Sequence, residues 1–490
     1  MLTITILGTS SDCGKSWFAT ALCAWLRRQG YNGAPFKAQN MSNNAYVTLE
    51  GGEIGVAQAE QAMACGKRPI AEMNPVLLKP LGDSTSQVIV NGHPFRKVHA
   101  AQYYDILHEL YPHVNAALEY WKHHCEVLVI EGAGSPVELN LQNRDLSNLY
   151  PSRYTQGRWI LISDIERGGV FAQVAGTSSL LPKDDLSRGL GFVVNKFRGD
   201  PSLFANAAPF FKRCTDLPYF GTLPYQSELR PSHEDGLNLP QSSAEETGPL
   251  MTWIRFPHVA NATDAQPWLM DEGVQVRWVE APEEADGAKI IVLPGTRNTR
   301  ADLHWLLNKG WGRCLRAAAQ KNQTVIGICG GYQMLGKLIR DDHGLEEEAG
   351  QSEALGLIDM TTVYGPKKNV RQVQVHEDGC TWDAYEIHHG ETIHRETPVP
   401  FTQIEIAGKP QAEGYQSGNL IGTYLHGLFD HPTMRKRIAH ASGIDNYQAT
   451  SLPWSEAKQN MVESMADRLD EHLDLNPLRD YLNTLRTSDT

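Results

Sequence analysis

Short apolar runs alternate with segments of helix length along most of this chain, and this alternation constrains its fold more than any other feature. Apolar runs at residues 2–7, 126–130, 159–163 and 190–196 each have the length of a buried strand. A continuous apolar run is typical of a strand covered on both faces, as in a parallel sheet whose crossovers are helices. The first part of the chain therefore predicts βαβ units around a parallel sheet.

The same pattern restarts after a polar segment at residues 226–249, which is rich in Pro, Ser and Glu and predicts a connection between domains. Beyond it, apolar runs such as 251–256 and 324–329 predict a second parallel sheet. Period-two alternation at 370–377 and 401–408 predicts antiparallel strands added to that sheet. At 490 residues the chain is too long for one ordinary core. We expect two doubly wound α/β domains, at residues 1–235 and 250–445, and a C-terminal helical extension at 446–490.

Charge and cysteine content exclude several classes of protein. The formal net charge of −13 argues against a general binder of nucleic acid or of membrane surfaces. No apolar stretch is long enough to span a bilayer, and the first residues lack the basic region of a signal peptide. The eight cysteines form no CxxC pair, which is typical of free thiols in a reducing cytoplasm. We expect a cytoplasmic protein with small-molecule partners, and the oligomeric state is left open.

A glycine-rich turn, GTSSDCGKS at residues 8–16, lies between a predicted strand and a predicted helix, as a phosphate-binding loop does. Lys15 would neutralise oxygens near the transferred γ-phosphate of ATP, and the Ser16 hydroxyl would bind Mg²⁺. The loop is one residue longer than GxxxxGK[ST]. A plain glycine turn beside a solvated lysine is the alternative, but strand, loop, GKS and helix all coincide here. The expected contacts with ATP and its phosphates are Gly8, Thr9, Asp12, Gly14, Lys15 and Ser16.

Carboxylates near other strand ends supply candidate ligands for Mg²⁺. Glu131 directly follows the apolar run at 126–130, at the edge of the sheet where α/β proteins bind ligands. A carboxylate there can hold Mg²⁺ directly or through water. Glu53, in GGEIGVAQ, is a second candidate from its position. The predicted Mg²⁺ ligands are therefore Ser16, Glu131 and Glu53.

A dense polar run, PFKAQNMSNNA at residues 35–45, follows the second predicted strand. Beside a phosphate loop it predicts a surface that hydrogen-bonds a substrate carrying many amide or carboxylate groups. An exposed loop without a ligand is the alternative. The segment NPVLLKPLGDSTSQVIVNG, residues 74–92, adds a second such surface. The expected substrate contacts are Lys37, Gln39, Asn40, Asn43, Lys79 and Gln87.

A second glycine-rich turn, GICGGYQML at residues 327–335, places Cys329 between a predicted strand and a predicted helix. Glycines permit the strained backbone of a turn that presents a nucleophile. A buried structural cysteine is the alternative, but it does not explain the surrounding glycines. His426, in GTYLHGLF, follows an apolar run and is available as a general base. The backbone N–H of Gly295, at the end of another strand, can help to stabilise an oxyanion.

Residues from about 250 to 440 resemble a class I glutamine amidotransferase domain, which implies a flavodoxin-like fold with Cys329 as nucleophile and His426 as base. Most members of that class carry His-x-Glu, whereas Leu428 occupies the third position here. Glu386, in YEIHHGET, is a candidate for the orienting carboxylate. The expected glutamine and oxyanion contacts are Gly295, Gly330, Gln333 and Glu386.

The first glycine loop has the spacing of dethiobiotin-synthetase-like ATPases, and the resemblance implies a P-loop-type ATPase domain. In related ATPases an Asn after the corresponding strand contacts the nucleobase, and Asn195 has that position here. An ATP site and a glutaminase on one chain predict an amide ligase. ATP converts a carboxylate to an acyl phosphate, and ammonia released from glutamine attacks it.

The chain as a whole resembles the cobyric acid synthase family of cobalamin (vitamin B12) biosynthesis over most of residues 1–430. The resemblance implies ATP- and glutamine-dependent amidation of the b, d, e and g carboxylates of a corrinoid, adenosylcobyrinic acid a,c-diamide, with Mg²⁺. From composition and spacing alone we infer only an ATP-dependent, glutamine-fed amide ligase. The matching stretches include GTSSDCGKS, FKAQNMSNN, MNPVLLKP, EGAGSPVE, VVNKFRGD, LPGTRNT, GICGGYQMLG, YEIHHGET and GTYLHGLF.

Three alternatives stay open. The related cobyrinic acid a,c-diamide synthases perform the same chemistry on two other side chains, although the QNMSNN segment favours the first choice. Partitioning and septum-positioning ATPases share the longer loop, but they carry a signature lysine where this chain has Thr9, Ser10 and Ser11. A second domain without catalytic activity is disfavoured by Cys329 and His426 in their loop contexts.

Overall fold

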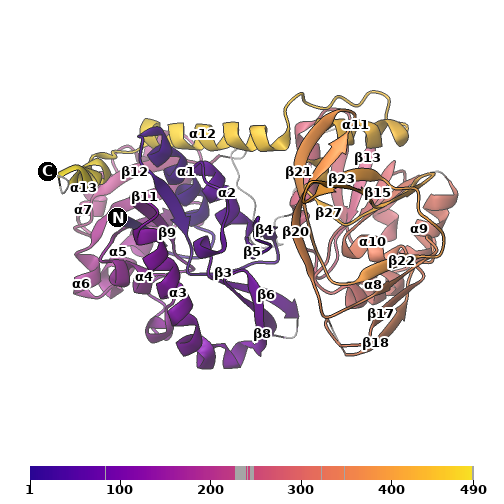
Figure 1. Ribbon diagram of the computed structural model, residues 1–490. Coiled ribbons are helices and arrows are strands. Elements are labelled where there is room, and N and C mark those ends of the chain that lie inside the picture. The colour runs from indigo at the N-terminus through magenta and orange to yellow at the C-terminus, as the bar shows by residue number, and fades with distance from the viewer. Residues whose placement is uncertain are drawn as a thin grey trace.

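Figure 1 shows the computed structural model as two halves in contact, with one long C-terminal helix that runs from the second half across the first. Most of the predicted connection at 226–249 lies outside the described residues. No helix in the described part of the chain combines the length and apolar character that a membrane span requires. The structure describes residues 1–82, 84–226, 239, 241–242, 248–321, 323–346 and 348–487.

Six parallel strands form the central sheet of the first half, in the order β12-β11-β10-β1-β9-β2. Successive side chains of a strand point to opposite faces. Accordingly, Val129 packs in the apolar cluster of α1, whereas its neighbour Ile130 packs in that of α3. Both faces are covered, which confirms the predicted parallel sheet. The strands are β1 (Leu2–Gly8), β2 (Gly33–Phe36), β9 (Val127–Glu131), β10 (Arg158–Asp164), β11 (Gly189–Phe197) and β12 (Tyr219–Pro224).

The helices of the first half lie on both sides of this sheet. Cluster membership places α1 on one face and α3, α5 and α7 on the other. They are α1 (Lys15–Arg28), α2 (Val56–Ala64), α3 (Leu107–Lys122), α4 (Leu149–Thr155), α5 (Val170–Leu180), α6 (Lys183–Leu186) and α7 (Ala208–Lys212).

Two small sheets extend the first half toward the second (Figure 1). One has the order β3-β6-β7-β8, and the other is the antiparallel pair β4-β5. The polar run at residues 35–45 therefore becomes short strands rather than an open loop. The strands are β3 (Gln39–Met41), β4 (Ala45–Val47), β5 (Glu53–Gly55), β6 (Val76–Gly82), β7 (Thr85–Val90) and β8 (His93–His99).

The second half is built on another six-stranded sheet, in the order β14-β13-β15-β16-β26-β25. All neighbours are parallel except β25, which pairs antiparallel with β26. Its strands are β13 (Leu250–Ile254), β14 (Gln275–Val279), β15 (Ile290–Leu293), β16 (Thr324–Ile328), β25 (Tyr415–Ser417) and β26 (Leu420–Thr423). Its helices are α8 (Thr299–Asn308), α9 (Trp311–Gln320), α10 (Gly330–Met334) and α11 (Pro432–Ala441).

The predicted antiparallel strands at 370–377 and 401–408 are present as β20 and β23, but they do not join the central sheet. They belong to a separate five-stranded sheet, β24-β23-β20-β21-β27, so their predicted placement is wrong. A four-stranded sheet, β18-β17-β19-β22, completes this half. The bounds are β17 (Leu338–Asp341), β18 (Gly350–Glu353), β19 (Met360–Val363), β20 (Asn369–Glu377), β21 (Cys380–His388), β22 (Glu391–His394), β23 (Thr402–Ile406), β24 (Lys409–Glu413) and β27 (Leu425–His426).

The two halves meet where the small sheets of the first lie against the five-stranded sheet of the second. Tyr385 and Ile387 of β21 share an apolar cluster with Ala45 and Val47 of β4. The backbone N–H of Ala45 also donates to Asn261 Oδ1 at 3.1 Å. This contact combines buried apolar surface with hydrogen bonds and places the halves in a defined relative position.

The C-terminal helices α12 (Trp454–His472) and α13 (Asn476–Thr487) follow the second half in sequence but pack on the first. In α12, Met465 and Leu469 are fully buried in the cluster that covers α1. Trp25 Nε1 donates to Asp470 Oδ1 at 2.9 Å. The sheet of the first half is thus covered on one face by residues from both ends of the chain.

We expect Leu469→Ala to lower the free energy of unfolding by about 2–5 kcal/mol, because it opens a cavity in a fully buried cluster. Urea unfolding measures the loss. The matched control is Asn460→Ala, since Asn460 is exposed on the same helix. Equal stability of the two variants would show that α12 does not support the core of the first half.

Candidate active site

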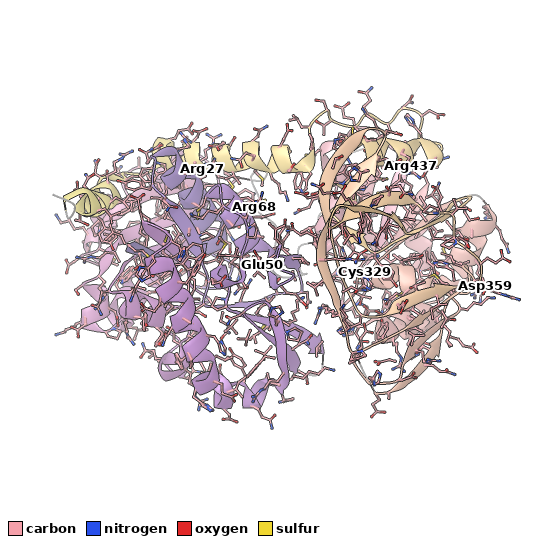
Figure 2. The ribbon with its side chains drawn as sticks, viewed as in Figure 1. Arg27, Glu50, Arg68, Cys329, Asp359 and Arg437 are labelled. Carbon is pink, nitrogen blue, oxygen red and sulfur yellow. The ribbon has the colours of Figure 1, made fainter. Side chains whose placement is uncertain are left out.

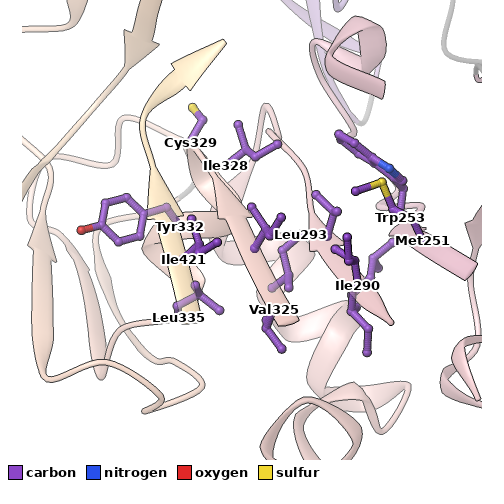
Figure 3. Close-up of a cluster of buried hydrophobic side chains, with 14 of the residues drawn as sticks. Met251, Trp253, Ile290, Leu293, Val325, Ile328, Cys329, Tyr332, Leu335 and Ile421 are labelled. Carbon is purple, nitrogen blue, oxygen red and sulfur yellow. The ribbon is translucent and has the colours of Figure 1, made fainter. Parts of the chain in front are cut away.

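Cys329 lies at the end of β16 in a strained backbone conformation, with φ 52° and ψ −112°. Its N–H donates to Thr423 O at 2.8 Å, and its thiol lies 3.7 Å from Ile387 O. Figure 3 shows its sulfur directed away from the labelled apolar side chains below it. A positive φ at a residue other than glycine is costly and is concentrated at functional sites. This geometry favours a nucleophile over a packed structural thiol.

The glycines around Cys329 are required by close packing. A Cβ atom at Gly331 would lie 2.0 Å from Leu293 O, and one at Gly422 would lie 2.1 Å from the Tyr332 ring. At Gly330, a Cβ would lie 2.6 Å from Thr296 Cγ2. The turn can therefore sit tightly against β15 and β26 only without these side chains, which explains the glycine-rich sequence.

His426 is buried next to the nucleophile and is oriented by Asp264. The distance from His426 Nδ1 to Asp264 Oδ2 is 2.7 Å, and the N–H of Gly427 donates to Asp264 Oδ1 at 2.9 Å. The neighbouring Cys329 also favours the charged form of the imidazole. Burial lowers the pKa of His426, but the Asp264 carboxylate and Cys329 outweigh it and raise the pKa to about 10. At neutral pH the imidazole therefore favours its protonated form beside Cys329.

The prediction of Glu386 as the orienting carboxylate is wrong. Its Oε2 accepts from Arg371 Nε at 2.6 Å, while Asp264 occupies the position beside His426. Leu428, where most amidotransferases of this class carry Glu, is buried in the apolar core. Sequence reasoning missed Asp264, although it follows β13, and loops after parallel strands share one edge of the sheet. The position of Asp264 in a loop after a parallel strand was the feature from which its place near His426 could have been predicted.

Cys329 lines a pocket at the contact between the halves. Figure 2 labels Cys329 in the second half. Leu81 and Gln87 of the first half line the pocket together with Gly330 and Gln333 of the second. Gln87 was predicted to contact the substrate of the ATPase half. It lies instead in the pocket of Cys329, at the contact with the second half. The first half thereby helps to close the pocket of the second.

Two of the predicted glutamine contacts, Gln333 and Gly295, have defined surroundings in the structure. Gln333 Nε2 donates to His389 O at 2.8 Å, and its Oε1 accepts from the Tyr364 hydroxyl at 2.8 Å, so its side chain is held in place. At Gly295, a Cβ would lie 2.9 Å from His426 Cε1, so the backbone passes close to the imidazole. Contacts of Gly295, Gly330 and Gln333 with glutamine stay predictions.

Lys15 in the first half lies over the end of β1, and Gly8 makes room for it. A Cβ at Gly8 would lie 2.8 Å from Lys15 Nζ. The ammonium is held by Ser10 O at 2.9 Å and Gly134 O at 3.0 Å. Within the described residues it forms no salt bridge, so its charge is not cancelled by a neighbouring carboxylate. This arrangement suits a phosphate ligand.

Gly14 and Asn195 shape the same loop. Gly14 has φ 101°, and a Cβ there would lie 2.0 Å from Asn195 Nδ2. Asn195 Nδ2 donates to Cys13 O at 3.0 Å and so supports the loop, while its role at the nucleobase stays a prediction. The exposed Asp12 lies 3.5 Å from Lys196 Nζ, and its contact with ATP also stays a prediction.

Thr9 hydrogen-bonds within the protein, and its contact with phosphate stays a prediction. Its N–H donates to Ile162 O at 2.9 Å, and its hydroxyl donates to Gln173 Oε1 at 3.0 Å. Both donors are used within the protein. Thr9 therefore anchors the loop to β10.

Ser16 and Glu131 together fit Mg²⁺. Ser16 Oγ lies 2.8 Å from Glu131 Oε1, and a hydroxyl beside a carboxylate supplies the hard oxygen ligands that this ion prefers. Burial alone would raise the pKa of Glu131, but the Lys37 ammonium, 2.9 Å away, and hydrogen bonds lower it. The carboxylate is therefore ionised. Lys37 contacts Glu131, so its predicted contact with the substrate stays untested.

Glu53 and Lys79 are wrong as a metal ligand and a substrate contact. Both are fully buried, and they form a salt bridge with each other. The second Glu53 oxygen accepts from Lys368 Nζ of the other half at 2.6 Å. Burial would raise the pKa of Glu53, but the Lys368 and Lys79 ammonium groups lower it well below its ordinary value. The three side chains form an ionic contact between the halves.

A cavity of about 440 Å³ lies beside the phosphate loop and includes Ser11 and Gly134 in its lining. Gln39 lines it and accepts a hydrogen bond from the Tyr103 hydroxyl. Asn40 is turned inward instead and donates to Gln58 at 2.9 Å. The structure therefore places Gln39 at this cavity, while substrate contacts of Asn40 and Asn43 stay predictions.

Comparison with known proteins covers both halves. Residues 4–239 match the CobQ/CobB/MinD/ParA nucleotide binding domain, and residues 251–434 match the CobB/CobQ-like glutamine amidotransferase domain. A cobyric acid synthase of Nostoc punctiforme is 39% identical over 97% of this chain and 99% of its own length. One of Dehalococcoides mccartyi is 38% identical over 98% of each chain. The chain belongs to the cobyric acid synthase family.

Similarity to solved structures is weaker. The septum site-determining protein MinD of Pyrococcus horikoshii, complexed with Mg-ADP, is 15% identical with a TM-score of 0.25, over 46% of this chain and 82% of that chain. Membership of the cobyric acid synthase family therefore rests on the sequence relatives and the two matched domains.

In this cobyric acid synthase family member we expect Asp264→Asn to lower glutamine-dependent turnover by about 10²–10⁴-fold, because the imidazole loses its orienting carboxylate. The same change removes the charge that raises the pKa of His426, so the imidazole loses its proton at lower pH. The alkaline limb of the pH–rate profile should move from near 10 toward neutrality. Glu386→Gln is the matched control and should leave the limb in place. Equal profiles for both variants would contradict the role of Asp264.

Proposed function

We propose that this chain is a glutamine-hydrolysing cobyric acid synthase, a carbon–nitrogen ligase. It amidates the b, d, e and g carboxylates of adenosylcobyrinic acid a,c-diamide to give adenosylcobyric acid, with ATP and glutamine as co-substrates. The observation that carries the proposal is the presence, on one chain, of a buried Cys329–His426–Asp264 arrangement and a glycine-rich loop whose Lys15 forms no salt bridge among the described residues. Relatives that are cobyric acid synthases match along almost the whole chain.

The second half releases ammonia from glutamine. Cys329 transfers its thiol proton to His426, and the sulfur attacks the side-chain amide carbon of glutamine. His426 then donates that proton to the departing nitrogen, and a thioester stays on Cys329. Water hydrolyses the thioester to glutamate and restores the thiol. Asp264 keeps the imidazole in the orientation that both proton transfers need.

The first half makes the carboxylate reactive. Transfer of the γ-phosphoryl group of ATP to a corrinoid carboxylate gives an acyl phosphate, and ammonia displaces phosphate to form the amide. Lys15 stabilises charge on the phosphate oxygens during transfer. Ser16 and Glu131 would hold Mg²⁺, which neutralises phosphate charge when bound.

We assign the cavity beside the phosphate loop to part of the corrinoid, because of the chemistry of its lining. Tyr103, Tyr104 and Met41 give it apolar surface, while Gln39 and Arg144 supply polar groups. A flat macrocycle with many carboxylate and amide arms needs both kinds of contact. Its position next to Ser11 brings a bound carboxylate close to the phosphate loop.

We also assign the enzyme to the cytoplasm, with small molecules as its partners and without nucleic acid or membrane partners. All eight cysteines are free, which suits a reducing compartment. The net charge of −13 supports the same choice of partners.

Identification of the product tests the reaction. The purified enzyme is incubated with the a,c-diamide, ATP, Mg²⁺ and glutamine, and mass spectrometry counts the carboxylates converted. Conversion of cobyrinic acid at its a and c positions, with no reaction of the a,c-diamide, would favour a cobyrinic acid a,c-diamide synthase instead.

We expect Cys329→Ala to lower glutamine-dependent synthesis by about 10⁴-fold or more, because the nucleophile is lost. High ammonium should still support synthesis, since the first half is unchanged. Cys314→Ala, at a thiol of the same half that lies outside the pocket, is the control and should keep both activities. Failure of both nitrogen sources in a folded Cys329→Ala protein would refute the division of labour.

We expect Lys15→Ala to stop amide synthesis from either nitrogen source, because phosphoryl transfer loses its cation. Glutamine hydrolysis should persist, since that chemistry belongs to the other half. Lys183→Ala removes an exposed lysine of the same half and serves as the control. Substantial amide formation by Lys15→Ala would remove the basis for the phosphate-loop assignment.

A further inference from the structure

The pocket beside Cys329 is lined by charged side chains that the mechanism above does not use. Arg297, Lys368 and Glu346 all line it. Two of them have partners within the protein. Lys368 is paired with Glu53, and Glu346 accepts from the Thr299 N–H at 2.7 Å and the Tyr364 hydroxyl at 3.1 Å.

Arg297 differs from the other two. Its Nε is buried and finds no hydrogen-bond partner among the described residues, and no salt bridge to the side chain is present there either. Burial lowers the pKa of Arg297 below its ordinary value. Glu53 and Glu346 attract the guanidinium, but neither forms a salt bridge with it among the described residues. An anionic ligand in the pocket would give the buried Nε the hydrogen-bond partner that it lacks there.

The backbone holds Arg297 in a fixed place relative to the nucleophile. It follows Gly295 and Thr296 in the loop after β15, and Gly295 approaches the His426 ring. The Arg297 N–H donates to His258 O at 2.9 Å. The guanidinium and the Cys329 thiol thus line one pocket from two loops at the same edge of the sheet.

We infer that Arg297 binds the α-carboxylate of the glutamine whose side-chain amide is attacked by Cys329, which rests on the proposed glutaminase function. A guanidinium binds a carboxylate through two parallel hydrogen bonds, so it sets the orientation of the amino acid as well as its affinity. Glu346 lines the same pocket, and although burial raises its pKa to about 7, its carboxyl oxygens can accept hydrogen bonds from the α-ammonium of an amino acid. Arg297 is a specificity-determining residue that separates glutamine from other primary amides.

The test compares glutamine with 4-aminobutanamide, which keeps the amide and the amine but lacks the α-carboxylate. Hydrolysis is measured with the corrinoid, ATP and Mg²⁺ present. The native enzyme should prefer glutamine by roughly 10³-fold or more in kcat/KM, because the analogue leaves the guanidinium unpaired. In Arg297→Met the KM for glutamine should rise by roughly 10²-fold, and the preference should fall to within about tenfold.

Two further variants sharpen the comparison. Arg297→Lys keeps the charge without the paired donors and should give an intermediate KM. Arg313→Met removes an exposed arginine of the same half and should leave KM and the preference unchanged. Ammonium-dependent synthesis reports whether each variant is folded, and if Arg297→Met is not, Arg297→Lys provides the comparison.

Equal kcat/KM for the two amides in the native enzyme would overturn the inference, whatever the variants do. An unchanged preference in a folded Arg297→Met protein would overturn it as well. Absence of glutamine hydrolysis in the native enzyme would count against the proposed function instead, so the two failures are distinguishable.

Discussion

The pairing of Glu53 with two lysines is the interaction on which the relative placement of the two halves depends. A carboxylate removed from water must be paired, and Glu53 is met by Lys79 of its own half and Lys368 of the other. Lys368 also lines the pocket of Cys329, where Leu81 and Gln87 reach in from the first half. One ionic contact therefore joins the halves at the border of the glutaminase pocket, and apolar packing around Tyr385 reinforces it.

Both halves place their chemistry by the same topological rule. In a parallel sheet the loops at the carboxyl ends of the strands meet at one edge, where a ligand can reach several of them. Ser16 and Glu131 meet at such an edge in the first half, and His426 and Asp264 meet beside Cys329 in the second.

Local features were predictable, and partners distant in sequence were not. The Lys15 loop and the Cys329 turn were found because glycines and polar residues sit together in a few consecutive positions. Glu386, Glu53 and Lys79 were assigned to sites from their neighbours in sequence, yet each is paired with a side chain from another strand. The strands at 370–377 and 401–408 had the right period, but period does not specify which sheet a strand joins.

The sequence by itself determined the parallel sheets and the two strand-end turns that carry Lys15 and Cys329, because the backbone conformations involved depend on residues adjacent in the chain. Only the tertiary structure decided that Asp264 orients His426, from a position 162 residues away, and that Arg297 Nε, in the pocket of Cys329, has no hydrogen-bond partner among the described residues. The physical reason is that a buried charge is stabilised by whichever group lies within hydrogen-bonding distance after folding. Which partner a buried charge receives depends on how distant segments pack and exclude water, so neighbouring residues in the sequence do not specify it.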